Sequence, residues 1–159
     1  MMSRLVITID PGVTTGWCDA YIKDNEILIQ YGQNEWSEFQ LYESLRIAEA
    51  DCIVYESFQY RAGAGMRQKG ILRPPELIGV IKLFGEETKT PLYPQGSSRA
   101  VGKDVVFTDK KLKDMGLYIS GKEHGRVACK HFLWWLHFGG GAQYVDRNNL
   151  RFELVHKKV

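Results

Sequence analysis

The 159-residue sequence has few cysteines, almost no net charge and no long hydrophobic run, and each absence excludes a class of protein. The cysteines (Cys18, Cys52 and Cys129) are odd in number, lie in apolar segments and lack metal-ligand spacing, so we expect reduced core thiols of a cytoplasmic protein. No apolar run reaches membrane-spanning length, and the N-terminus has no signal-peptide pattern. A net charge of +2 produces no global field for a polyanion, so any basic surface must be local.

A nucleotide-binding P-loop is also missing. In the segment Gly96–Lys103, five residues rather than four separate the glycines, and Asp104 follows the lysine where a P-loop has Ser or Thr. There is no internal repeat and no low-complexity segment. Length and an ordinary composition, 44% hydrophobic and 25% charged, predict a single domain over residues 1–159, with residues 142–159 as a C-terminal extension.

Two short apolar runs each end in an acid. The run Leu5–Ile9 ends in Asp10, which a turn rich in Pro and Gly follows at once, and the run Cys52–Tyr55 ends in Glu56. Each acid alone is typical of a solvated strand end, and an Arg, a Lys, water or a metal ion could stabilise its charge. Neighbouring strands would bring both acids to one edge of a sheet, and this pairing favours a shared metal site.

The expected order of elements, β-β-β-α-β and then mostly helices, predicts an α/β fold with a mixed central sheet flanked by helices. The first helix follows a capping box, Ser37 to Gln40. The last helix follows a second capping box, Ser120 to Glu123, and runs to His137. The other expected elements are strands at Trp17–Ile22 and Glu26–Tyr31, a helix from Pro74 or Pro75, a weak edge strand at Pro91–Pro94, a short helix from Thr108 to Gly116, and either a strand or a solvated tail at residues 151–155.

The last helix is strongly apolar, so we expect it to pack on the sheet. The apolar stripe that we expect to face the sheet consists of Val127, His131, Trp134 and Phe138, with Ala128, Phe132 and Trp135 beside it.

The stretch from Ser57 to Pro75 carries basic residues and no acidic ones, interleaved with aromatic residues and glycines. Because it follows Glu56 directly, it suits a phosphate backbone and unstacked bases beside an acidic pocket. A solvated surface loop is the alternative. Its basic and aromatic members are Phe58, Tyr60, Arg61, Arg67, Lys69 and Arg73.

Three blocks of the chain, in this order, resemble the catalytic blocks of RuvC-type Holliday-junction resolvases, most of all the short phage-encoded branch. They are Asp10–Gly12 with Thr15–Trp17, then Ile53–Phe58, then His124–His131, and the likeness spans roughly residues 4 to 137. The resemblance implies an RNase H-like fold and a homodimer that hydrolyses phosphodiester bonds of branched DNA in recombination and repair. It also implies a cytoplasmic location, which would be the host cell's cytoplasm for a phage protein.

The same resemblance assigns roles to residues. Asp10 and Glu56 would ligate Mg²⁺ or Mn²⁺, which activates the attacking water and stabilises charge on the scissile phosphate. A two-fold symmetric four-way junction suits a homodimer. Phe58 or Tyr60 would stack at the point of strand exchange. Phosphates would be held by Arg61, Arg67, Lys69, Arg99, Lys103 and Lys130.

One position departs from the family pattern, because Val127 stands where the family has an aspartate that completes the metal site. Glu123, one turn earlier, could supply the third carboxylate, although helical side chains lean away from that direction and its capping box competes for it. His124 matches the family histidine and could ligate the metal or transfer a proton. The third account is that cleavage is lost and a junction-binding protein remains. His131 and His137 are interpreted as core or interface residues.

Three function classes therefore stay open: a metal-dependent crossover junction endodeoxyribonuclease, a structure-specific DNA-binding protein that does not cut, and a nucleotide-binding module of the actin type. The third class needs two such domains, and this chain supplies one. Within the nuclease class, activity on RNA–DNA hybrids also stays open.

Overall fold

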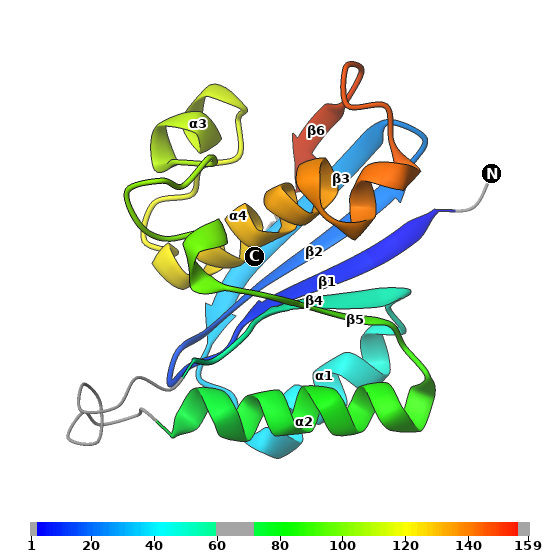
Figure 1. The fold of residues 1–159 in the computed structure, drawn as a ribbon, viewed down its shortest axis with the longest axis vertical. Helices are drawn as coiled ribbons and strands as arrows, with labels where there is room; N and C mark the ends of the chain where they lie inside the picture. Colours follow the sequence, from blue (N-terminus) through cyan, green and yellow to red (C-terminus); the bar gives the residue numbers. More distant parts are fainter. Residues whose placement is uncertain (1–2, 60–71, 156–159) are drawn as a thin grey trace.

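The structure is a computed structural model that describes residues 3–59 and 72–155. One sheet lies at its centre, with helices on both faces (Figure 1). The strands are β1 (Arg4–Asp10), β2 (Thr15–Lys23), β3 (Glu26–Asn34), β4 (Cys52–Glu56), β5 (Leu92–Gln95) and β6 (Arg151–Leu154). The helices are α1 (Glu38–Ala48), α2 (Arg73–Thr88), α3 (Asp109–Asp114) and α4 (Glu123–Phe138), with short 3-10 turns at Ser97–Arg99 and Gly140–Tyr144.

The sheet is mixed, with six strands in the order β5-β4-β1-β2-β3-β6. The first three strands form an antiparallel meander, whereas β4 pairs parallel with β1, β5 parallel with β4, and β6 parallel with β3. Because β1, β4 and β5 run in the same direction, their C-terminal ends meet at one edge of the sheet. The expected α/β class and mixed sheet are confirmed.

Alternation along the strands gives the sheet two separate cores. On β1, Val6 belongs to a core shared with α4, whereas Ile7 and Ile9 belong to a core shared with α1 and α2. Helix α4 covers one face, and α1 and α2 lie together over the other, as the ribbon shows (Figure 1). Within the described ranges, none of the helices has the length and apolar character that a membrane span requires.

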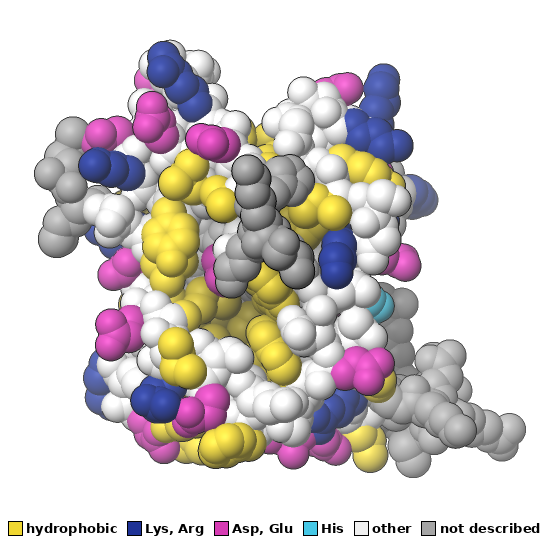
Figure 2. All heavy atoms as spheres, turned by 180° about the vertical axis from the view of Figure 1, so that it is seen from behind, with side chains coloured by type: hydrophobic (Ala, Val, Ile, Leu, Met, Phe, Trp, Pro, Cys, Tyr) yellow, Lys and Arg dark blue, Asp and Glu magenta, His cyan; other side chains and the backbone are white. Residues whose placement is uncertain are grey.

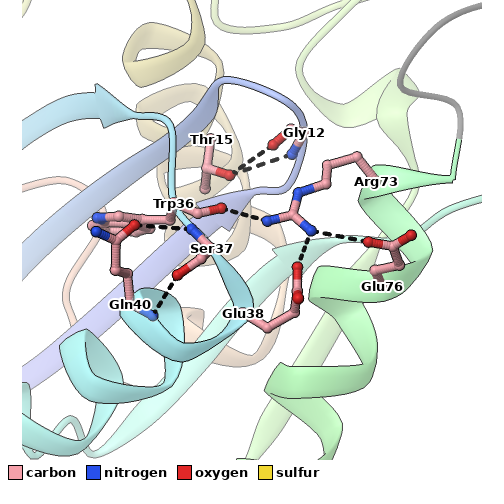
Figure 3. Close-up of polar contacts among 8 residues, drawn as sticks. All are labelled: Gly12, Thr15, Trp36, Ser37, Glu38, Gln40, Arg73 and Glu76. Carbon is pink, nitrogen blue, oxygen red and sulfur yellow. Dashed lines mark hydrogen bonds and ion pairs between the residues drawn. The ribbon is translucent and has the colours of Figure 1, made fainter.

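The starts of α1 and α2 are tied to each other (Figure 3). The expected capping box of α1 is present, since Ser37 Oγ accepts from the N–H of Gln40 and Gln40 Oε1 accepts from the N–H of Ser37. Arg73, the first residue of α2, donates to the carbonyl oxygen of Trp36 and to the carboxylates of Glu38 and Glu76. The guanidinium of Arg73 thus serves as an inter-helix clamp.

Helix α4 begins later than its sequence predicts. Its N-cap is Lys122, which makes no side-chain cap bond, and Gly121 turns the chain before it with a φ of 75°. The backbone N–H of His124 instead donates to Gln33 Oε1 of β3 at 3.0 Å. The expected capping box from Ser120 to Glu123 is therefore wrong, because a side chain from the sheet replaces the local cap.

The expected apolar stripe of α4 is also corrected. Phe138 is 52% exposed, and Val127 and Trp134 are only half-buried. Of the expected stripe only His131 is fully buried, and it packs on the sheet together with the residues expected beside the stripe. The fully buried set on α4 is Ala128, Cys129, His131, Phe132, Leu133 and Leu136, with Trp135 at 1%.

The remaining elements agree with expectation. Helix α3 starts at an N-cap, Thr108, whose Oγ1 accepts from the N–H of Lys111, and Gly116 follows it with a φ of 73°. The weak strand β5 lies at one edge of the sheet. The C-terminal segment, for which the sequence left two possibilities, forms the strand β6 at the other edge.

Candidate functional site

The two acids selected from the sequence lie side by side. Asp10 is the last residue of β1 and Glu56 the last of β4, and these parallel strands are in register up to Ile9 and Tyr55. Their side chains are 16% and 19% exposed, respectively, so both carboxylates are largely removed from water. The strand ends therefore bring the pair together at one edge of the sheet, as the sequence pattern predicts.

The turn after Asp10 allows α4 to approach this edge. Thr15 Oγ1 donates to the carbonyl oxygen of Gly12 at 3.0 Å and closes the turn (Figure 3). At Gly16, a Cβ atom would lie 1.9 Å from the carbonyl oxygen of His124, so only glycine lets the first turn of α4 dock on β2. This docking places His124 Nδ1 3.7 Å from Asp10 Oδ2, with the His124 side chain 46% exposed.

A second histidine, which the sequence analysis interpreted as a core or interface residue, contacts the other carboxylate. His131 Nε2 lies 3.2 Å from Glu56 Oε2, and the His131 side chain is fully buried. The signal for it was present in the sequence, because residues seven apart lie on the same helix face and His131 follows His124 by this spacing. On its other side, His131 contacts Gln95 at the end of β5. The interpretation of His131 as a core residue is right, but the sequence did not predict its contact with Glu56.

Asp10 and Glu56 lie close enough to shift each other's pKa. Burial raises the pKa of Asp10 above its ordinary value, and hydrogen bonding with and repulsion by the Glu56 carboxylate raise it further. Burial also raises the pKa of Glu56, but hydrogen bonds with His131 and with Asp10 outweigh it and hold this pKa below its ordinary value. The opposite shifts are those of two coupled acids, and a bound cation would relieve the repulsion between them.

Glu123, proposed as the third carboxylate, lies elsewhere. Glu123 and Val127 line a pocket of about 310 Å³ between α4 and the segment that leads into α3. The structure does not bring Glu123 to Asp10 and Glu56. In the part of the chain that the structure describes, no group of three or more His, Cys, Asp or Glu side chains is close enough to hold a metal ion.

The pocket that Glu123 lines already contains ion pairs. Lys130 Nζ lies 2.8 Å from Asp109 Oδ1, and Arg126 Nε lies 3.4 Å from the same atom. The side chains of Arg126 and Lys130 are each 12% exposed. The ammonium of Lys130, expected to hold phosphate, is therefore paired within the protein.

The other expected DNA contacts differ in their surroundings. Phe58 is half-buried and lines a pocket with residues of α2, including Ile78 and Lys82. Arg99 places its guanidinium 4.1 Å from the centre of the Trp134 ring, and Lys103 is exposed. Tyr60, Arg61, Arg67 and Lys69 lie outside the described residues. Arg73, the last cation of that stretch, is occupied by its clamp.

A largely apolar cavity of about 290 Å³ lies on a different part of the molecule, between the sheet and α1. Its lining includes Trp17, Trp36 and Leu41. Hydrophobic side chains surround a hollow on the face seen from behind, while acidic and basic side chains are mixed around it (Figure 2). The cavity and the carboxylate pair are thus chemically distinct, because the cavity offers little polarity to a charged ligand.

The donor set at the carboxylate pair fits a hard divalent cation. Mg²⁺ is usually bound through one or two carboxylates, with water and substrate phosphate completing its shell. Two adjacent, largely buried carboxyl groups, one of which has a pKa raised by burial and then by the other carboxyl, match this chemistry. Asp10 and Glu56 are therefore the protein groups that could hold such an ion.

Solved structures share this fold. The Thermus thermophilus RuvC bound to a Holliday junction substrate is 17% identical, with a TM-score of 0.63 over 89% of this chain and 97% of that one. The fowlpox virus Holliday junction resolvase is 15% identical, with a TM-score of 0.56 over 84% and 97%. The yeast mitochondrial Holliday junction resolvase is 14% identical, with a TM-score of 0.55 over 87% and 80%. No protein-family model matches the sequence, and comparison with curated protein sequences found no match.

Proposed function

We propose that this chain is a metal-dependent endonuclease that resolves Holliday junctions and other branched DNA by phosphodiester hydrolysis. The observation that carries the proposal is the pairing of Asp10 and Glu56 at the ends of parallel strands, in a fold whose solved examples include junction resolvases. The fold is similar to the RuvC-type, RNase H-like architecture expected from the three sequence blocks. We further propose crossover junction endodeoxyribonuclease activity, in recombination and repair, for a phage-encoded protein of the host cytoplasm.

The carboxylate pair would hold Mg²⁺ or Mn²⁺. When bound there, the ion supplies Lewis-acid activation of the scissile phosphate and of the attacking water. The chain's own contribution is to hold two acids close together in a partly dry edge of the sheet, where their charge is poorly solvated without a cation. His124, next to Asp10 and half in solvent, is positioned to accept or deliver a proton.

The substrate would be held by basic and aromatic groups. We propose Arg99 and Lys103 as phosphate contacts and Phe58 as a stacking residue, together with Tyr60, Arg61, Arg67 and Lys69 of the basic stretch. A homodimer would present two such sites to the two opposed strands of a four-way junction, whose two-fold symmetry a C₂ dimer matches.

A second candidate is a junction-binding protein that does not cut. It is favoured by the position of Val127 and Glu123, which line a different pocket and leave two carboxylates at the edge. The same basic and aromatic groups would then bind the junction without cleaving it. The two candidates differ in one measurable step, the breakage of a phosphodiester bond.

The decisive experiment is a nicking assay on synthetic substrates of matched sequence. A labelled four-way junction, a linear duplex and an RNA–DNA hybrid are each incubated with the full chain and Mg²⁺, Mn²⁺ or EDTA. We expect nicks in the junction with either metal, none with EDTA, and much slower cutting of the duplex.

Each other outcome identifies a different protein. Tight junction binding without nicks would leave the non-cutting binder. Cleavage confined to the hybrid would indicate an RNase H-like activity, whereas equal cutting of junction and duplex would contradict structure selectivity. Cutting that persists in EDTA would overturn the role proposed for the carboxylate pair.

A further inference from the structure

A buried chain of hydrogen bonds leads away from the carboxylate pair into the protein. His131 Nε2 lies 3.2 Å from Glu56 Oε2, and His131 Nδ1 lies 3.0 Å from Gln95 Nε2. His131 is fully buried and Gln95 is 7% exposed. This series of hydrogen bonds has the Glu56 carboxylate at its outer end, the Gln95 amide at its inner end and the His131 imidazole between them.

The orientation of the Gln95 amide follows from a backbone carbonyl. Gln95 Nε2 also lies 3.1 Å from the carbonyl oxygen of His131, which can only accept a hydrogen bond. The atom near both groups must therefore be the amide nitrogen, because an amide oxygen there would face another oxygen. Gln95 thus donates two hydrogen bonds, one to the backbone of His131 and one to its ring.

The amide orientation then decides the tautomer of the ring. Because Gln95 donates to Nδ1, this ring nitrogen accepts, and the hydrogen of the neutral imidazole lies on Nε2. Nε2 is the nitrogen next to Glu56, so His131 is a hydrogen-bond donor toward the carboxylate. The lowered pKa of Glu56 is consistent with such a donor, although burial alone would raise it.

Strand register accounts for the position of Gln95. It is the last residue of β5 and pairs with Glu56 of β4, and the backbone N–H of Ser57 donates to its carbonyl oxygen at 2.8 Å. Gln95 Oε1 is buried and has no hydrogen-bond partner among the described residues. Burying an unpartnered amide oxygen costs free energy, which the two donated hydrogen bonds must offset.

We propose that Gln95 and His131 are positioning residues for Glu56. Gln95 sets the tautomer of His131, and His131 uses its Nε2–H to restrict the rotation of the Glu56 carboxylate, so that Glu56 is aimed with Asp10 toward one divalent cation. This inference deepens the proposed function, on which it rests, and it adds two residues that touch neither the cation nor DNA. Outer hydrogen-bond partners of this kind orient ligands and support metal affinity.

The tautomer can be measured on the wild-type chain without any substitution. A long-range ¹⁵N–¹H correlation spectrum of the metal-free, ¹⁵N-labelled protein separates protonated from unprotonated ring nitrogens, and His131→Gln identifies the signal. We expect a protonated Nε2 and an unprotonated Nδ1 for His131. A hydrogen on Nδ1 in the wild-type protein would overturn the proposal.

The effect on the cation can be measured with Mn²⁺ alone, by calorimetric titration. We expect His131→Leu and Gln95→Leu to weaken Mn²⁺ binding by roughly 10- to 100-fold. His131→Gln should recover most of the loss, because its amide N–H can still reach Glu56. Gln95→Glu should change the tautomer signal as well, because a carboxylate accepts where the amide donates.

Two matched variants test for general destabilisation. His137, on the same helix, directs Nδ1 to the carbonyl oxygen of Leu133, and Gln143 donates to the carbonyl oxygen of Gly140. His137→Leu and Gln143→Leu should leave Mn²⁺ affinity unchanged. Equal losses in these controls, or unchanged affinity in both Gln95→Leu and His131→Leu, would contradict the positioning role.

Failure of this inference can be told apart from failure of the proposed function. If the wild-type chain binds Mn²⁺ and shows the expected tautomer but never cuts a junction, the nuclease proposal fails and the positioning role stands. If the chain cuts junctions with Mn²⁺ but His131 carries its hydrogen on Nδ1, the positioning role fails alone.

Discussion

Helix α4 has two charged sides, and they differ in kind. On the side that faces the strand ends, its histidines contact Asp10 and Glu56, two acids of the same sign held close together. On the side that faces α3, Arg126 and Lys130 surround a single acid, Asp109. The first cluster brings two acids together, whereas the second pairs one acid with two cations.

The pKa values of Asp10 and Asp109 are shifted in opposite directions. The pKa of Asp10 is raised, by burial and then by Glu56, whereas the pKa of Asp109 is lowered, mainly by its hydrogen bond with Lys130. Like charges held together destabilise the cation-free protein and stabilise a complex with a cation, while opposite charges stabilise the protein itself. This contrast separates a candidate site from a structural cluster on the same helix.

The largest expected effect is on cleavage. Asp10→Asn and Glu56→Gln should each reduce metal-dependent nicking of a four-way junction by at least about 100-fold, because each removes a charged oxygen ligand. Junction binding in EDTA should be largely retained. Asp114→Asn, at an exposed acid that ends α3, is the matched control. Full-rate nicking by both site variants would show that Asp10 and Glu56 do not form the metal site.

The next largest effect concerns the docking of α4. Gly16→Ala places a methyl group against the carbonyl oxygen of His124, so the first turn of α4 must move away from β2. Overpacking of this kind costs about 1–3 kcal/mol, and each kcal/mol lowers Tm by about 2–4 °C in a chain of this size. Gly79→Ala, at a helical glycine with open space around it, should be neutral or stabilise by up to about 1 kcal/mol. Equal Tm values for both variants would contradict the close approach.

A third prediction tests which side of α4 faces the acids. Val127 follows His124 by three residues and precedes His131 by four, so Val127→Asp should bring a third acid toward Asp10 and Glu56 and raise Mn²⁺ affinity and nicking. Burying part of this new charge should lower the free energy of unfolding by about 1–3 kcal/mol, measured by denaturant titration. Unchanged Mn²⁺ affinity and nicking would mean that position 127 does not reach Asp10 and Glu56.

The pH dependence of stability should have opposite signs at the two aspartates. The folded-state pKa of Asp10 lies above its ordinary value of 3.8, so the stability it contributes is present below that value and is lost as the pH rises through the raised pKa. In EDTA, Asp10→Asn should therefore match the wild type near pH 4 and exceed its Tm by about 2–4 °C at pH 8.

At Asp109 the folded-state pKa is lowered, so its contribution is present above 3.8 and is lost as the pH falls through the lowered pKa. Asp109→Asn should be less stable than the wild type at pH 7, by about 1 kcal/mol or less because the side chain is 46% exposed, and the difference should shrink in acid. Thermal unfolding at several pH values measures both trends. Parallel curves for the two variants would remove the contrast between the clusters.

The smallest effect is expected at an exposed cation. Lys103→Gln should weaken junction binding modestly and reduce the slope of log affinity against log salt by about one, as loss of one phosphate contact requires. Lys23→Gln, at the opposite end of β2 from Gly16, should leave the slope unchanged. Fluorescence anisotropy at several salt concentrations measures both, and identical slopes would exclude Lys103 from the DNA surface.

The sequence predicted the pair of acids because the information is local. An apolar run that ends in Asp10, and another that ends in Glu56, define two strand ends, and parallel pairing then leaves little choice of position. The capping boxes show the limit of local signals. At Ser37 no competing partner intervenes and the box forms, whereas near Ser120 the side chain of Gln33 caps the helix instead.

What the sequence determined by itself was the fold class, the strand ends and the two acids, since periodicity and strand termini need only neighbouring residues. What only the tertiary structure decided was the rotation of α4 about its axis. That rotation brings His131 rather than Glu123 to the carboxylates, and places Gln95 behind it. A helix with apolar residues on several sides has no single preferred face, so packing against the sheet, with Gly16 as the point of closest approach, makes the choice.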